Sequence, residues 1–138
     1  MPFSPEALQT IWLTLQLASL TTLILLIIAT PLAWWLAHTR SGWRTPLAAL
    51  AALPLVLPPT VLGYYLLTAM GGASPLGAFY ERMTGSPLAF SFEGLLVGSL
   101  IFNLPFALMP MERAFESIPV EVRQAAECCG LSWYRTMW

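Results

Sequence analysis

Three long stretches without Asp, Glu, Lys or Arg restrict how this chain folds. They cover residues 7–38, 45–80 and 94–111. A helix needs about 20 mostly apolar residues to cross the ~30 Å hydrocarbon core of a bilayer, and each stretch reaches or approaches that length. We therefore expect an all-α, polytopic membrane protein with spans at about 10–37, 47–70 and 94–111, forming one domain over residues 1–138.

The composition excludes an ordinary soluble domain. Charged residues make up 9% of the chain, against about 25% in soluble proteins, and Lys and Asp are absent. The first apolar stretch is not typical of a cleaved signal peptide, because no Lys or Arg precedes it and it exceeds a ~7–15-residue apolar core. We expect it to be retained as the first span.

The arginines predict the orientation, since short cytoplasmic loops are enriched in positive charge. The loop after the first span holds Arg40 and Arg44 and no acidic residue. The next loop, residues 71–93, holds one arginine and two glutamates, and three further arginines follow the third span. We expect the first loop and the carboxyl-terminal segment inside, with the 71–93 loop and the amino terminus outside.

Prolines inside the predicted spans are the second unusual feature. Each removes a backbone donor and leaves a carbonyl that lipid cannot satisfy. We expect Pro31 to kink the first span, and Pro105 and Pro110 to interrupt the third. The Pro58-Pro59-Thr60 run in the second span indicates either a cavity or gate, or a bend packed against neighbouring helices. The prolines in question are Pro31, Pro54, Pro58, Pro59, Pro105 and Pro110.

No Asp, Glu, Lys, Arg or His lies within the predicted spans, which argues against a proton- or ion-coupled carrier and indicates that the energy for transport comes from another subunit. The polar groups there are hydroxyls and an amide, which can donate to a passing oxyanion or bond between helices. The polar set is Thr60, Tyr64, Tyr65, Thr68, Ser99 and Asn103. The candidate translocation path or gate comprises Pro58, Pro59, Thr60, Tyr64 and Asn103.

A polar segment, residues 119–138, follows the third span. Pro119 suits the first position of a helix, and Gly130 is expected to end it in a left-handed conformation. Small apolar residues recur at helical spacing on one face, and charged or polar residues occupy the rest. Ser132 is expected to begin a second short helix. The small face comprises Val122, Ala125, Ala126 and Cys129, and the polar remainder Glu121, Arg123, Gln124 and Glu127.

Two uses fit this segment. It could lie in the membrane interface, where Trp133, Tyr134 and Trp138 would be at home. Its mixed charges and small apolar residues favour the second use, which is docking in a groove of a soluble partner. We name residues 119–138 the docking segment, with Glu121, Gln124, Ala125, Ala126, Glu127 and Gly130 as its candidate contact residues.

Two stretches carry a resemblance to a known family. Residues 53–67, with Pro58-Pro59 at their centre, resemble the second span of molybdate importer permeases of the ATP-binding cassette (ABC) type. Residues 124–130 resemble the cytoplasmic docking loop of ABC importers, in which Ala-Ala is followed after three residues by Gly. The resemblance covers nearly the whole chain.

The resemblance implies a bacterial inner-membrane permease that pairs as a homodimer. Its implied partners are a cytoplasmic ATPase and an extracytoplasmic oxyanion-binding protein. ATP hydrolysis would belong to the ATPase, so the chain is not expected to be an enzyme or to hold a cofactor. No nucleic-acid partner is expected. In such a protein Ala126→Asp would uncouple ATP hydrolysis from uptake.

The sequence departs from the family pattern in two ways. Gln124 stands where the motif begins with Glu. The motif also continues with Ile, Leu and Pro at positions that would be 140, 142 and 143, and family members have further spans. We therefore expect the chain to be a fragment of a longer permease.

Several alternatives stay open. A sulfate or thiosulfate permease of the same family would carry an anion of the same shape and charge. A three-span membrane adaptor would recruit a partner without transport. A membrane enzyme is not indicated, because no paired-carboxylate, Ser/His or metal-ligand pattern is present and His38 has no partner in the spans. Cys128 and Cys129 are expected to be reduced thiols.

Overall fold

The computed structural model describes residues 5–39 and 41–130, and this part of the chain forms six helices and no strand. The all-α prediction is confirmed. By length and hydropathy α1 and α5 can each cross a membrane, and α2 with α3 can form a third, bent span. The helices are α1 Pro5–His38, α2 Arg44–Val56, α3 Pro59–Met70, α4 Pro75–Thr84, α5 Phe92–Glu116 and α6 Val120–Cys128.

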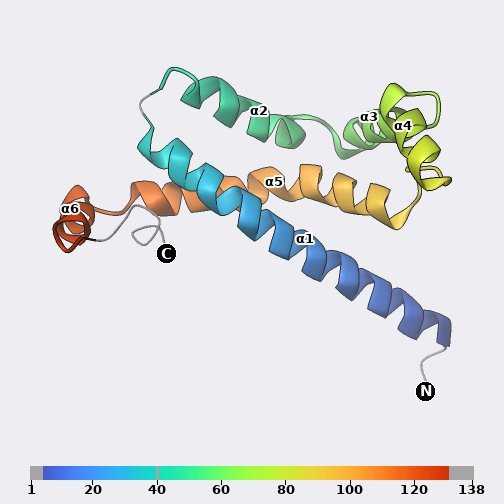
Figure 1. The fold of residues 1–138 in the computed structure, drawn as a ribbon, viewed down its shortest axis with the longest axis horizontal. Helices are drawn as coiled ribbons and strands as arrows, with labels where there is room; N and C mark the ends of the chain where they lie inside the picture. Colours follow the sequence, from blue (N-terminus) through green and yellow to red (C-terminus); the bar gives the residue numbers. More distant parts are fainter. Residues whose placement is uncertain (1–4, 40, 131–138) are drawn as a thin grey trace.

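Helices α1 and α5 form the most extensive contact, and they cross near their carboxyl ends (Figure 1). Ala33, Leu36 and Leu108 are at most 1% exposed there. Ala33 has a small side chain, which lets two membrane helices approach closely. Trp34 packs edge-on against Phe115, with ring centroids 5.2 Å apart. The two helices run in the same direction, as two spans separated by one return crossing must.

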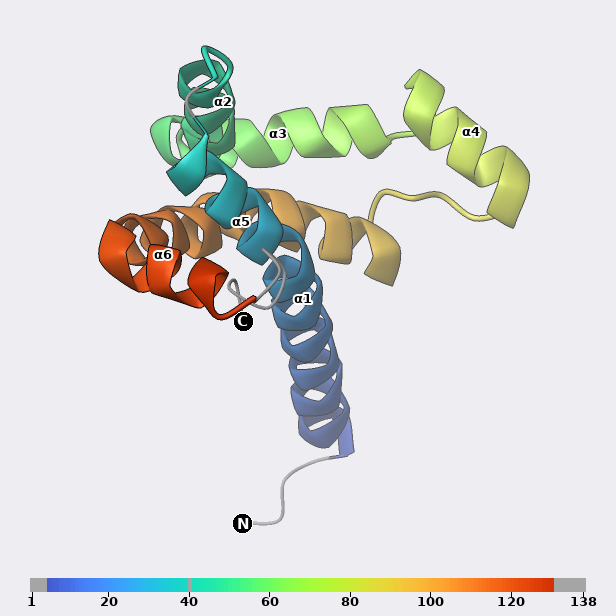
Figure 2. The same cartoon turned by 60° about the vertical axis from the view of Figure 1, so that its left-hand side comes forward.

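Toward their amino ends α1 and α5 separate, which both views show (Figures 1 and 2). The most apolar window of α1 is only 11% buried within the chain. The side chains of Trp12 and Ile27 are 70% and 71% exposed. Lipid or another membrane helix must cover such surfaces, because neither side chain is stable in water.

The span predicted over residues 47–70 is not one straight helix. Helices α2 and α3 are bent by 106° at the break between them. Leu57 and Pro58 are extended, with ψ of 136° and 137°. A residue before proline avoids the helical region, so two successive prolines hold both positions out of the helix. We name residues 57–58 the elbow.

The loop predicted over residues 71–93 contains a helix, α4. The Ser, Pro and Gly residues that indicated a loop are the ones that begin and end helix α4. The Ser74 hydroxyl accepts a bond from the Gly77 amide at 2.9 Å, and Pro75 occupies the first turn. Gly85 ends the helix with φ of +76°. Capping residues and loop residues overlap in type, which is why the prediction missed this helix.

Isolated prolines do not interrupt the long helices. Helix α1 continues through Pro31, and α5 continues through Pro105 and Pro110. The predicted interruption of the third span was therefore wrong. One proline removes one helical hydrogen bond, whereas ending a helix in lipid would expose several backbone groups. Only the double proline at Pro58-Pro59 breaks a helix.

A close backbone approach at Gly94 gives a stability prediction. A Cβ atom on Gly94 would lie 2.2 Å from the Leu88 carbonyl oxygen, whereas one on Gly98 would meet nothing nearer than 3.9 Å. The Gly94 amide also donates to the Ser91 hydroxyl at 3.0 Å. Gly94→Ala should therefore destabilise the detergent-solubilised protein by about 1–3 kcal/mol.

Gly98→Ala is the matched control on the same helix and should not lower the thermal midpoint. Intrinsic fluorescence on heating would measure both variants. Equal midpoints for Gly94→Ala and wild type would contradict the packing described at the start of α5.

Candidate functional site

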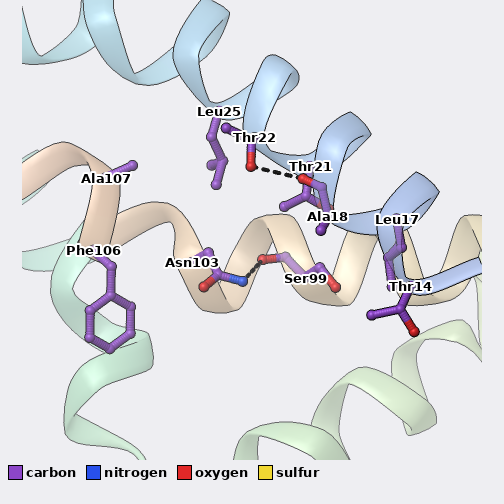
Figure 3. Close-up of a pocket in the computed structure, with 10 residues that line it drawn as sticks. All are labelled: Thr14, Leu17, Ala18, Thr21, Thr22, Leu25, Ser99, Asn103, Phe106 and Ala107. Carbon is purple, nitrogen blue, oxygen red and sulfur yellow. Dashed lines mark hydrogen bonds between the residues drawn. The ribbon is translucent and has the colours of Figure 1, made fainter. Parts of the chain in front are cut away.

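A cavity of about 480 Å³ lies where α1 and α5 begin to separate. Figure 3 shows its lining side chains on both helices. The walls are mostly apolar, with three threonine hydroxyls, one serine and one amide among them. Helix α1 contributes Thr14, Leu17, Ala18, Thr21, Thr22 and Leu25, and α5 contributes Ser99, Asn103, Phe106 and Ala107.

Three of the polar side chains that line this cavity, Thr14, Thr22 and Asn103, donate hydrogen bonds to carbonyls of their own helix. The Asn103 side-chain amide donates to the Ser99 carbonyl at 2.8 Å, and the Thr22 hydroxyl donates to the Ala18 carbonyl at 2.8 Å (Figure 3). Thr21 differs, because it is only 7% exposed and its hydroxyl has no hydrogen-bond partner in the described structure. A buried hydroxyl without a partner is unfavourable. Thr21 is therefore the one buried side chain here with unused hydrogen-bonding capacity.

A second cavity, of about 400 Å³, lies between α3 and α5. Ser99 and Asn103 line both cavities. The two cavities therefore lie on either side of the turn of α5 that carries these residues. Of the predicted path residues, Pro59 and Asn103 line the second cavity. Pro58, Thr60 and Tyr64 line neither. All three are exposed, and Tyr64 packs edge-on against Tyr65.

The sequence analysis missed the threonines of α1. Thr14, Ala18 and Thr21 recur at helical spacing, which places them on one face of α1 toward α5. That pattern was visible in the sequence. Helix α1 is apolar on all sides, so the sequence alone does not indicate which of its faces packs toward α5.

Helix α6 corresponds to the predicted docking segment. It begins directly after Pro119, and Gly130 follows it with φ of +75°, as predicted. Glu121, Gln124 and Ala125 are exposed. The backbone at positions 126 and 127 is helical, but the Ala126 and Glu127 side chains lie outside the described structure. So do residues 131–138, including the second short helix predicted there.

Helix α6 lies past the carboxyl end of α5 and runs across its direction (Figure 1). The closely packed helix pairs are α1–α5, α2–α5, α3–α4 and α3–α5, and α6 belongs to none of them. Within residues 5–39 and 41–130, no other helix covers its exposed residues. Within residues 5–39 and 41–130, no group of three or more His, Cys, Asp or Glu side chains is placed to hold a metal ion.

Sequence comparison finds molybdenum transport permeases and, at lower identity, a sulfate transport permease among the known proteins similar to this chain. No family model matches the sequence. The molybdenum transport system permease protein ModB of Azotobacter vinelandii is 51% identical over 125 residues, covering 88% of this chain and 55% of the relative. ModB of Escherichia coli K12 is 32% identical over 127 residues, covering 92% of the chain and 56% of the relative. This chain is homologous to the ModB permeases.

The chain spans about half the length of the ModB relatives that it matches. A more distant relative is the probable sulfate transport system permease protein cysT of Zygnema circumcarinatum. It is 30% identical over 134 residues, covering 97% of this chain and 46% of the relative. The chain is thus similar to ModB permeases over most of its own length, and two of its helices, or three spans if α2 and α3 form one, are long and apolar enough to cross a membrane.

The unpartnered hydroxyl of Thr21 gives a prediction for stability. Thr21→Val keeps the shape of the side chain and removes the buried hydroxyl, so it should stabilise the protein by about 1 kcal/mol. Thr22→Val is the control, because the Thr22 hydroxyl already bonds to its own helix and is exposed. Thermal unfolding in detergent would measure both. Destabilisation by Thr21→Val alone would show that the hydroxyl has a partner in the folded protein.

Proposed function

We propose that this chain is part of the permease subunit of an ATP-driven molybdate importer. The observation that carries the proposal is its 51% identity to a ModB permease over 88% of its length. ATP hydrolysis belongs to a separate ATPase subunit, and the permease provides the path for the anion. An extracytoplasmic binding protein delivers the oxyanion, and two copies of the permease enclose the path.

The two cavities beside α5 support a role in anion passage. Their polar side chains are neutral, so they can donate hydrogen bonds without holding a dianion by charge. Asn103 lines both cavities, and Thr21 has a buried hydroxyl without a partner. A carrier must bind its substrate weakly enough to release it, which neutral donors allow.

The arrangement of charges supports the orientation. Helices α1 and α5 run in the same direction (Figure 1). Arg44, which follows α1, and Arg113 both contact Glu116 in the last turn of α5, so both lie at the end of the bundle from which α6 follows. Positive charge marks the cytoplasmic side, so α6 faces the cytoplasm and the amino terminus faces the periplasm. There the exposed residues of α6 dock on the ATPase.

A sulfate permease is the second candidate. The sulfate relative covers 97% of the chain, although at only 30% identity. A non-transporting membrane adaptor is the third, and it would bind a partner through α6 without moving an anion.

Reconstituted uptake tests these candidates together. Proteoliposomes would contain the complete permease with its ATPase and binding protein, and molybdate entry would be followed with and without ATP. We expect ATP-dependent molybdate uptake that a large excess of sulfate does not suppress. Suppression by sulfate would favour the sulfate permease. Absence of any ATP-dependent uptake, with the ATPase bound, would contradict the importer and favour the adaptor.

A further inference from the structure

A cluster of four charged side chains joins the beginning of α2 to the end of α5. The Arg44 guanidinium lies 3.2 Å from a Glu112 carboxylate oxygen and also contacts the Glu116 carboxylate. Arg113 contacts the other Glu116 oxygen at 2.9 Å. Glu112 and Glu116 are one helical turn apart, so both reach the same guanidinium. We name Arg44, Glu112, Arg113 and Glu116 the ion-pair cluster.

The cluster lies next to the connection between α5 and the docking helix. Only residues 117–119 separate α5 from α6. The Ser117 amide donates to the Arg113 carbonyl at 3.1 Å, and the Ser117 hydroxyl donates to the Ala114 carbonyl at 2.7 Å. The Ile118 amide bonds to the Phe115 carbonyl at 3.3 Å. These bonds attach the connection to the last turn of α5, so a displacement of α6 reaches the turn that carries Glu116.

Helix α2 has little else that holds its cytoplasmic half. None of its residues is buried, although Ala51 packs against the core around Leu108. A cavity of about 360 Å³, lined by Ala48 and Met109 among others, leaves the two helices incompletely packed beside the cluster. The ion pairs of Arg44 are therefore the charged contacts that hold the beginning of α2 against α5 in the described structure.

The other end of α2 meets α3 at the elbow. The 106° bend there makes α2 and α3 two arms with different directions. Helix α3 in turn forms one wall of the cavity that contains Asn103. A change in the tilt of α2 would thus alter that cavity through the elbow.

We propose that Arg44 is a positioning residue that couples the docking helix to the broken α2–α3 span. Movement of α6 shifts the last turn of α5, and the carboxylates of Glu112 and Glu116 carry Arg44 with them. Both carboxylates contact the same Nη2 atom of Arg44, so one cation is linked to two positions one helical turn apart on α5. The proposal rests on the proposed importer function and adds the route between the ATPase and the anion path.

Charge reversal and charge exchange test this route in the complete transporter. Arg44→Glu places three carboxylates together and should lower molybdate uptake per ATP hydrolysed by roughly 10-fold. The double variant Arg44→Glu with Glu112→Arg restores an opposite pair and should recover most of the ratio. Arg82→Glu, on exposed α4 and outside the cluster, is the matched control and should leave the ratio unchanged.

The ratio distinguishes coupling from folding, and immunoblots of membranes would show that each variant is inserted. If Arg44→Glu is not inserted, Arg44→Gln takes its place as the single variant, and it should lower the ratio because it removes the cation that links α2 to Glu112 and Glu116. An unchanged ratio in the single variant would overturn the proposal, and so would an inserted double variant that fails to recover. A wild-type transporter complex whose ATPase hydrolyses ATP without any movement of molybdate would instead overturn the importer function itself.

Discussion

The packing of α1 against the carboxyl-terminal part of α5 is the contact on which the other elements depend. Ala33 and Leu36 meet Leu108 there with almost no exposed surface. Helices α2 and α3 both pack on α5, and α6 follows directly from its end. Because lipid tails are as apolar as leucine, close packing rather than exclusion of water must hold this crossing together. The small alanines of α1 make that approach feasible.

The remainder of the fold divides into a closely packed end and an open end. At the crossing, aromatic side chains and the ion-pair cluster connect α1, α2 and α5. Away from it, α1 and α5 separate, and neutral polar side chains line the space between them. The ion-pair cluster therefore lies near the end of α5 that precedes α6, while the polar side chains that line the space between α1 and α5 are uncharged. This separation is compatible with a permease that receives its energy from an attached subunit and passes an anion through an uncharged path.

The sequence predicted the all-α class, the apolar segments that form α1 and α5, and a helix between Pro119 and Gly130. Two strong signals supported these predictions. The first is the long uncharged stretches, and the second is Gly130, which follows a segment with helical periodicity and has φ of +75° in the structure. The bend at Pro58-Pro59 was anticipated as a cavity, gate or bend, but its 106° angle was not. Helix α4 was missed because Ser74, Pro75 and Gly85 serve equally as loop residues and as caps.

The ion-pair cluster could not be predicted at all. Arg44 is 68 residues from Glu112, and only the parallel course of α1 and α5 brings them together. The threonine face of α1 was predictable in principle from its spacing. Its partner across the cavity, Asn103, was identified from its polarity inside a span, which is a local signal. Contacts between distant segments depend on the packing of whole helices, and no local pattern records them.

Exposed thiols at the end of α6 allow the most direct test of the central claim, that α6 faces the cytoplasm and docks on the ATPase. Cys128 and Cys129 are the only cysteines of the chain, and both are exposed. A membrane-impermeant maleimide should label them in inside-out vesicles and not in right-side-out ones, and bound ATPase should protect them. Labelling from the periplasmic side, or labelling that bound ATPase does not reduce, would contradict the account.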